Sequence, residues 1–200
     1  MKFNELKAMA NKYGNFDLEK YFEKTGNKYS IFLIDYPKKK FIFQDGVNEI
    51  DIIKEFRSNF DFSNSNISAL YKQLEIKDTF EVFMFNINLV ESKDTELLEL
   101  VIFHEICHLL EKTEYYKELE ITFSDEDIRV GGQLHSIANK INNNLGGWGT
   151  DNDHNDSFGQ ILFYFLRVYK NEDKYKLLGK AMIKNFLDDY SEEFQNETNE

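Results

Sequence analysis

The chain has 200 residues, of which 42% are hydrophobic and 30% charged, and its formal net charge at pH 7 is -12. A chain of this size and composition can bury a sizeable core, which argues against disorder. The acidic excess argues against a nucleic-acid partner, because affinity for phosphate depends on Lys and Arg, and it is more compatible with cationic peptides.

Hydrophobic spacing predicts helices and then a hairpin near the N-terminus. Residues 3–22 have the spacing of two short amphipathic helices, separated by Gly14–Asn15. Residues 28–34 and 41–43 are rich in aromatic and β-branched side chains and predict a β-hairpin. The lysines at 38–40 are expected in its solvated turn, next to the only proline of the chain.

The next segments lead to a strand. Residues 47–60 have helical spacing, and a polar connector at 61–66 marks a weak subdivision of the chain. Residues 67–76 predict a further helix. In residues 79–89, Phe side chains alternate with Met and Asn side chains, which predicts a half-buried strand.

Residues 95–112 are apolar on nearly every face, which is typical of a helix buried in a core. Asp94 or Thr95 is expected to cap its N-terminus, and Glu96 suits the positive end of the helix dipole.

The rest of the chain is predicted to be mainly helical. Helices are expected at 125–142, 157–169 and 174–190, with a Gly- and Asn-rich loop at 143–153 and a frayed acidic tail at 191–200. We therefore predict one α+β domain over residues 1–190. A small antiparallel or mixed sheet would pack against the buried helix, with a mainly helical C-terminal part.

The buried helix carries the pattern H-E-x-x-H at 104–108, which has the spacing of a zinc peptidase site. Residues four apart share a helix face, so His104 and His108 are expected to bind one Zn²⁺. Glu105, one step around the helix, is expected to act as the general base. Cys107 points away from the two histidines by helical geometry and is expected to pack in the core.

A catalytic zinc site takes three protein ligands and one water, so a third ligand must come from another segment. His154 is the preferred candidate because it lies between a Gly-rich loop and a predicted helix. Other candidates for the third ligand stay open: His135, Asp153, Asp156, Glu120 and Glu126. For His135, a role in supporting the ligands is also considered.

The motif helix after an alternating strand resembles the zincin metallopeptidases, and His154-x-x-x-Phe158 is similar to the third-ligand segment of SprT-like and related minimal zincins. The resemblance implies zinc ligands His104, His108 and His154 and the base Glu105. It also implies a substrate that lies extended along an edge strand, for which residues 79–89 are the nearest candidate. The chain has no downstream Cys-x-x-Cys zinc ribbon, so we assign the class and leave the family open.

The predicted function is hydrolysis of peptide bonds in a peptide or protein substrate, with one zinc ion as cofactor. The alternative is a catalytically inactive zincin-like module that binds zinc or a protein partner. A helical interaction protein with incidental histidines is a third hypothesis, suggested by the many Phe and Tyr residues.

Cellular location is predicted from the N-terminus, the hydropathy and the cysteine count. Residues 1–7 lack the apolar core and cleavage site of a secretory signal, and no stretch has the apolar length that spans a bilayer. The single cysteine excludes an internal disulfide. We therefore expect a cytoplasmic protein without a membrane partner.

Overall fold

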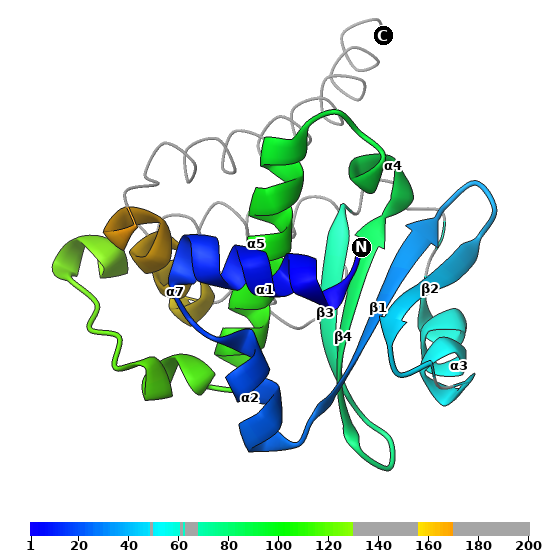
Figure 1. Cartoon of the computed structure of the whole chain (residues 1–200), viewed down its shortest axis with the longest axis horizontal. Coiled ribbons are helices and arrows are strands. Elements are labelled where there is room, and N and C mark those ends of the chain that lie inside the picture. The colour runs from blue at the N-terminus through cyan, green and yellow to red at the C-terminus, as the bar shows by residue number, and fades with distance from the viewer. Residues whose placement is uncertain (49, 61, 63–67, 130–155, 170–200) are drawn as a thin grey trace, which may run out of the picture. The chain divides into compact units, whose positions relative to one another are not determined.

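A computed structural model describes residues 1–48, 50–60, 62, 68–129 and 156–169 (Figure 1). The chain divides into two compact units, Met1–Ile121 and Thr122–Glu200. The elements of the first unit are, in chain order, α1 (Phe3–Gly14), α2 (Leu18–Thr25), β1 (Lys28–Asp35), β2 (Lys40–Gly46), α3 (Ile50–Asn59), β3 (Ala69–Glu75), β4 (Thr79–Asn86), α4 (Ile87–Val90), α5 (Thr95–Lys112) and the 3-10 helix η1 (Tyr115–Leu119). In the second unit the described elements are a helical segment at 125–129 and α7 (Asp156–Val168).

The four strands form one mixed sheet in the order β2-β1-β4-β3. β1 runs parallel to β4, with Phe32 beside Met84, and the outer pairs β1–β2 and β3–β4 are antiparallel. β4 is therefore an internal strand, and among the described strands β2 and β3 are the two edges. The expectation that residues 79–89 offer an open edge to a substrate is wrong, because β4 is paired on both sides.

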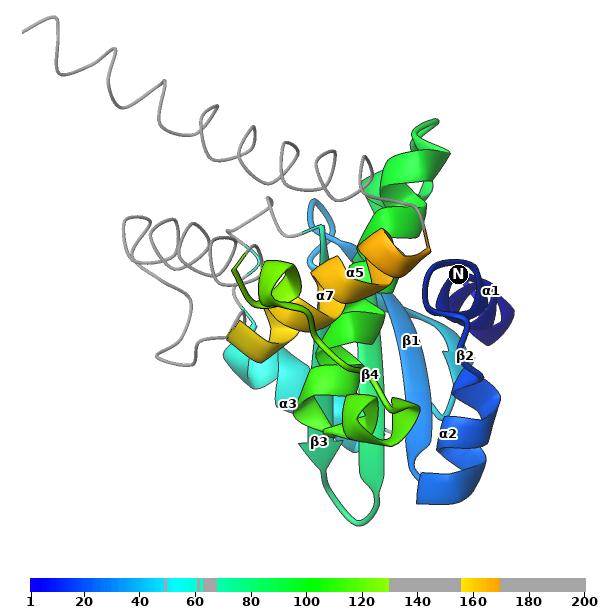
Figure 2. The same cartoon turned by 90° about the vertical axis from the view of Figure 1, so that its left-hand side faces the viewer.

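Both faces of the sheet are covered, and α3 and α5 lie on opposite sides of it (Figures 1 and 2). On the α3 side the buried core residues are Phe32, Ile34, Tyr36, Ile52, Phe56, Leu74, Phe80, Val82 and Met84. On the α5 side the buried strand residues include Ile31, Leu33, Tyr71, Phe83 and Phe85. β4 is consequently buried from Phe80 to Asn86 and is not the half-buried strand that its alternation predicted.

Several predicted elements are confirmed. The two N-terminal helices are α1 and α2, separated where Asn15 adopts a left-handed conformation with φ of 47° and Asp17 caps α2. The hairpin is β1–β2, with the lysines at 38–40 exposed. The helix expected at 47–60 is the shorter α3, and the motif helix is α5.

The helix predicted for residues 67–76 is wrong, because this segment contains strand β3. Leu70, Tyr71 and Leu74 have spacing that suits one helix face, but in the strand Tyr71 and Leu74 face opposite sides of the sheet. Backbone pairing with β4 outweighs the local helical preference. After β4, Asn86 accepts a hydrogen bond from the Asn88 amide at 3.0 Å and starts α4, so the strand ends earlier than expected.

The predicted 157–169 helix is confirmed as α7, whereas other C-terminal predictions lie outside the described residues. These are the greater part of the 125–142 helix, the 143–153 loop, the 174–190 helix and the 191–200 tail; most of the 61–66 connector is also outside. Among the described helices, none combines the length and the apolar character needed to cross a bilayer.

The second unit contains an ion pair in which the Asp127 side chain is fully buried and the Arg167 side chain is 27% exposed. Arg167 on α7 donates from its Nε and from one terminal nitrogen to the two carboxylate oxygens of Asp127, at 2.7 Å each. The amide and hydroxyl of Ser124 donate to the same carboxylate at 2.7 and 2.8 Å. Burial alone would raise the pKa of Asp127, but the hydrogen bonds from Arg167 and Ser124 lower it below the ordinary value of 3.8.

Because Asp127 pairs with Arg167, we expect the substitution Asp127→Asn to lower the unfolding free energy measurably. The substitution leaves a mostly buried guanidinium without its counter-charge, so we expect a loss of roughly 2–3 kcal/mol in unfolding free energy. Because the folded pKa of Asp127 is depressed, this contribution is present above about pH 4 and is lost as the pH falls through the folded pKa. Urea denaturation at pH 7 and hydrogen exchange of the α7 amides measure it. Glu126→Gln, at an exposed neighbour, is the control, and equal stability of the two variants would contradict the assignment.

Candidate metal centre

The candidate site is built on α5, whose sequence favours a buried helix. Asp94 caps its N-terminus by accepting a hydrogen bond from the Leu97 amide at 3.0 Å. Every residue from Leu100 to Leu110 is buried, because α5 packs against β3 on one side and α1 on another. The two histidines and the glutamate of the motif are therefore fixed in the core of the first unit.

The two imidazoles converge. The Nε2 atoms of His104 and His108 lie 3.2 Å apart, and the ring centroids are 4.9 Å apart with an interplanar angle of 76°. The convergence follows from the four-residue spacing, because side chains four residues apart lie one above the other on the same helix face. Both residues are more than nine-tenths buried, with 9% of His104 and 8% of His108 exposed.

The nitrogen pair fits a zinc ion. A tetrahedral zinc with imidazole bonds of about 2.0–2.1 Å holds two such nitrogens roughly 3.3 Å apart. The observed separation also suits a direct hydrogen bond, in which one ring donates its N–H and the other accepts. In a zinc site, added zinc displaces the proton that the two rings share, whereas in a purely hydrogen-bonded pair that proton stays in place. A zinc-binding measurement distinguishes the two arrangements.

Glu105 and Cys107 occupy the same buried turn. Glu105 is 4% exposed and follows His104 directly, about 100° around the helix, so it lies beside the imidazole face. Cys107 is a fully buried free thiol, which confirms its predicted packing role. Burial and, less strongly, the charge of Glu105 raise the pKa of Cys107, so the thiol stays protonated and is a poor metal ligand.

The third ligand cannot be assigned within the described residues, where no group of three His, Cys, Asp or Glu side chains is suited to hold a metal. Glu120 and Glu126 are described and exposed. His154, His135 and Asp153 lie outside the described residues, and Asp156 begins α7 without a described side chain. His154 thus stays the prediction of the sequence.

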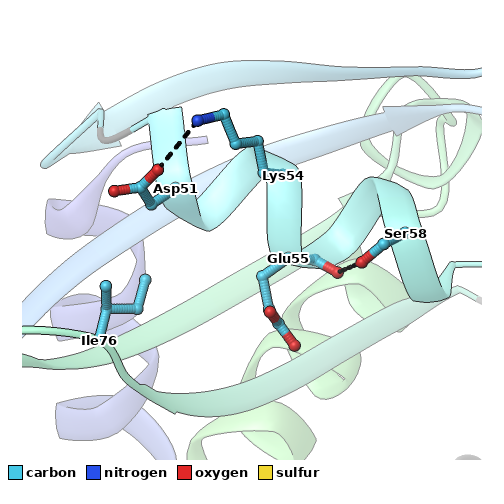
Figure 3. A pocket seen from close by; sticks show the side chains of 5 residues that line it. All are labelled: Asp51, Lys54, Glu55, Ser58 and Ile76. Atoms are coloured by element: carbon cyan, nitrogen blue, oxygen red, sulfur yellow. Dashed lines mark hydrogen bonds and ion pairs between the residues drawn. The ribbon is translucent and has the colours of Figure 1, made fainter.

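Two concave surfaces among the described residues offer no comparable chemistry. A groove of about 390 Å³ lies beside α3 and is lined by Asp51, Lys54, Glu55, Ser58 and Ile76 (Figure 3). Lys54 is paired with Asp51 at 3.3 Å, and both side chains are more than half exposed. A second pocket, near Asp17 and Tyr115, contains no motif residue. The imidazole pair is therefore the strongest candidate.

Sequence reasoning missed a buried carboxylate, Glu81, on β4. Its position alternates in phase with Phe83 and Phe85, so the strand pattern placed a charged residue among buried aromatic residues. That mismatch is the signal that could have identified it, because ionised groups are almost never fully buried without partners.

Comparison with known proteins gives no match to any family model, curated protein or solved structure. The site therefore rests on its own residues.

The imidazole pair predicts one zinc ion bound per chain, measured by calorimetry and by elemental analysis after dialysis. His104→Ala and His108→Ala should each weaken binding by at least about a hundredfold, beyond the effect of losing an outer-shell partner. From the sequence, His154→Ala should do the same, and His135→Ala, at the competing candidate, should weaken binding less than His154→Ala. Unchanged affinity in His104→Ala and His108→Ala would contradict the site.

Proposed function

We propose that this chain is a zinc-dependent metallopeptidase that uses one zinc ion. The observation that carries the proposal is the 3.2 Å approach of two Nε2 atoms on a buried helix, beside a buried glutamate. His104 and His108 would hold the metal, and His154 is the proposed third ligand. Zinc bound at such a site supplies Lewis acidity, which activates water and polarises a carbonyl group.

Glu105 is the proposed general base. Its carboxylate takes a proton from the attacking water and later delivers it to the leaving amine, so the peptide bond is cleaved with one water consumed. A burial of 96% favours this role, because a shielded carboxylate next to the reacting atoms exchanges its proton with them and not with bulk solvent. A site that only stabilises a fold has no need of such a group.

The substrate platform that we propose is β3 in place of β4. β3 is an edge of the sheet, it is antiparallel to β4, and α5 packs against it. An extended peptide can add to such an edge through main-chain hydrogen bonds, with alternate side chains entering pockets. The net charge of -12 favours cationic peptide or protein substrates over nucleic acid.

The cytoplasmic location is part of the proposal. Cys107 is a buried thiol, which is compatible with a reducing compartment.

A catalytically inactive zinc-binding or protein-interaction module is the second candidate function. Its specific support is that the 3.2 Å approach of the two Nε2 atoms also suits a direct hydrogen bond between the rings, which needs no catalytic metal. A closed site with four protein ligands, or no turnover with zinc bound, would favour this module.

The Glu105→Gln variant tests the enzyme assignment. Glutamine preserves volume and the nearby packing but cannot accept the proton, so we expect zinc affinity within a few-fold of wild type and a kcat lowered by about 10² to 10⁴. The assay is cleavage of a peptide library read by mass spectrometry with the zinc-loaded protein.

Glu96→Gln, on the exposed first turn of the same helix, is the control and should retain wild-type turnover. Full turnover by zinc-loaded Glu105→Gln would exclude Glu105 as the base. If the wild-type protein and both variants bind zinc but none of them cleaves a peptide, the inactive module would be favoured.

A further inference from the structure

Glu81 accepts four hydrogen bonds in the core of the first unit. The hydroxyls of Tyr21 and Tyr71 donate at 2.7 and 2.6 Å, one to each carboxylate oxygen. The side-chain amides of Asn27 and Gln73 donate at 2.6 and 3.1 Å. Glu81 is fully buried, and all four donors are neutral side chains from α2, β3 and the segment that precedes β1.

A buried carboxylate held by neutral donors is costly to form. An apolar residue of similar size at position 81 would avoid the desolvation of a charge, so packing alone does not account for it. Such networks fix the geometry of the groups that they join, because each donor is held in direction as well as distance. The elements that the Glu81 network connects therefore indicate which part of the fold it holds in place.

The two tyrosines of the network lie near the C-terminal end of α5. Tyr71 belongs to β3, the strand on which α5 packs. Burial, followed by the charge of Glu81 and more weakly that of Glu111 on α5, raises the pKa of Tyr71. The ring of Tyr21 packs edge-on against Tyr115, the first residue of η1, with 4.9 Å between centroids.

Two of these neighbours, Glu111 and Tyr115, follow the second histidine along the chain. Glu111 follows His108 by three residues and shares its helix face, and Tyr115 follows His108 by seven residues. The packing of β3 on α5 and the influence of Glu111 on Tyr71 place Tyr71 on the α5 side of β3, and the ring of Tyr21 packs on the residue that begins η1, just after α5. Both tyrosines are oriented by the same carboxylate.

We propose that Glu81 is a positioning residue, which through Tyr71 and Tyr21 holds the last turns of α5 so that the His108 imidazole faces that of His104. This inference rests on the proposed metal site and assigns a role to a residue on a neighbouring strand. Groups that orient metal-binding imidazoles from outside the ligand set contribute about 10- to 100-fold in metal affinity.

The test compares zinc affinity and stability in three variants, with affinity measured by competition against a chromogenic chelator. Tyr71→Phe removes one hydroxyl from Glu81, and Glu81→Gln keeps the volume but removes the charge. Tyr13→Phe is the matched control, because Tyr13 is also a buried tyrosine whose hydroxyl donates to a carboxylate, Glu99 on α5, at 3.0 Å. Glu99, however, precedes the motif.

We expect Tyr71→Phe and Glu81→Gln to bind zinc about 10- to 100-fold more weakly than wild type. Tyr13→Phe should lose stability in urea without losing affinity. If Tyr71→Phe does not fold, Tyr21→Phe, which keeps the Tyr71 hydrogen bond, should show a smaller loss of affinity in the same direction.

Affinities of Tyr71→Phe and Glu81→Gln equal to that of Tyr13→Phe would overturn the role of Glu81 while leaving the metal site intact. Absence of zinc binding by the wild-type protein would instead contradict the proposed function, so the two failures are distinguishable.

Discussion

The first unit depends on the burial of one internal strand. β4 is paired on both sides and buried on both faces, so two separate layers must cover it. The aromatic core under α3 covers one face, and α5 lies on the other side of the sheet (Figure 1). Because only a short connection that contains α4 separates α5 from β4, α5 packs in the core. The H-E-x-x-H residues are buried with it. Apolar burial on this scale is the dominant favourable term in folding.

Burial of α5 gives its polar residues their properties. The rings of His104 and His108 are held at 3.2 Å between Nε2 atoms in a setting from which most water is excluded. In such a setting each electrostatic contact is stronger than at a surface, and each orphaned polar group is more costly. The same reasoning applies to Glu81, whose four neutral donors form a second polar cluster on the α5 side of the sheet. In the proposed arrangement, Tyr71 and the end of α5 link the two clusters.

Local patterns in the sequence were sufficient for α1, α2, the hairpin and α5, because spacing, caps and breakers act within a few residues. The pair His104 and His108 was predictable for the same reason. Strand β3 was not, since its Lys, Gln and Glu side chains suit a helix and only pairing with β4 makes it a strand. The order of strands is also non-local, which is why β4 was mistaken for an open edge. Glu81 gave a signal, a charge in phase with Phe83 and Phe85, but its four donors come from distant segments.

His104 and His108 are proposed to bind zinc through the nitrogens that approach each other in the structure. X-ray absorption at the zinc K-edge, on protein loaded with one equivalent of zinc, tests it most directly. We expect at least two imidazole ligands at about 2.0–2.1 Å and an additional light-atom ligand that azide or another small anion can displace. A spectrum without imidazole scattering, or protein that retains no zinc after dialysis, would contradict it.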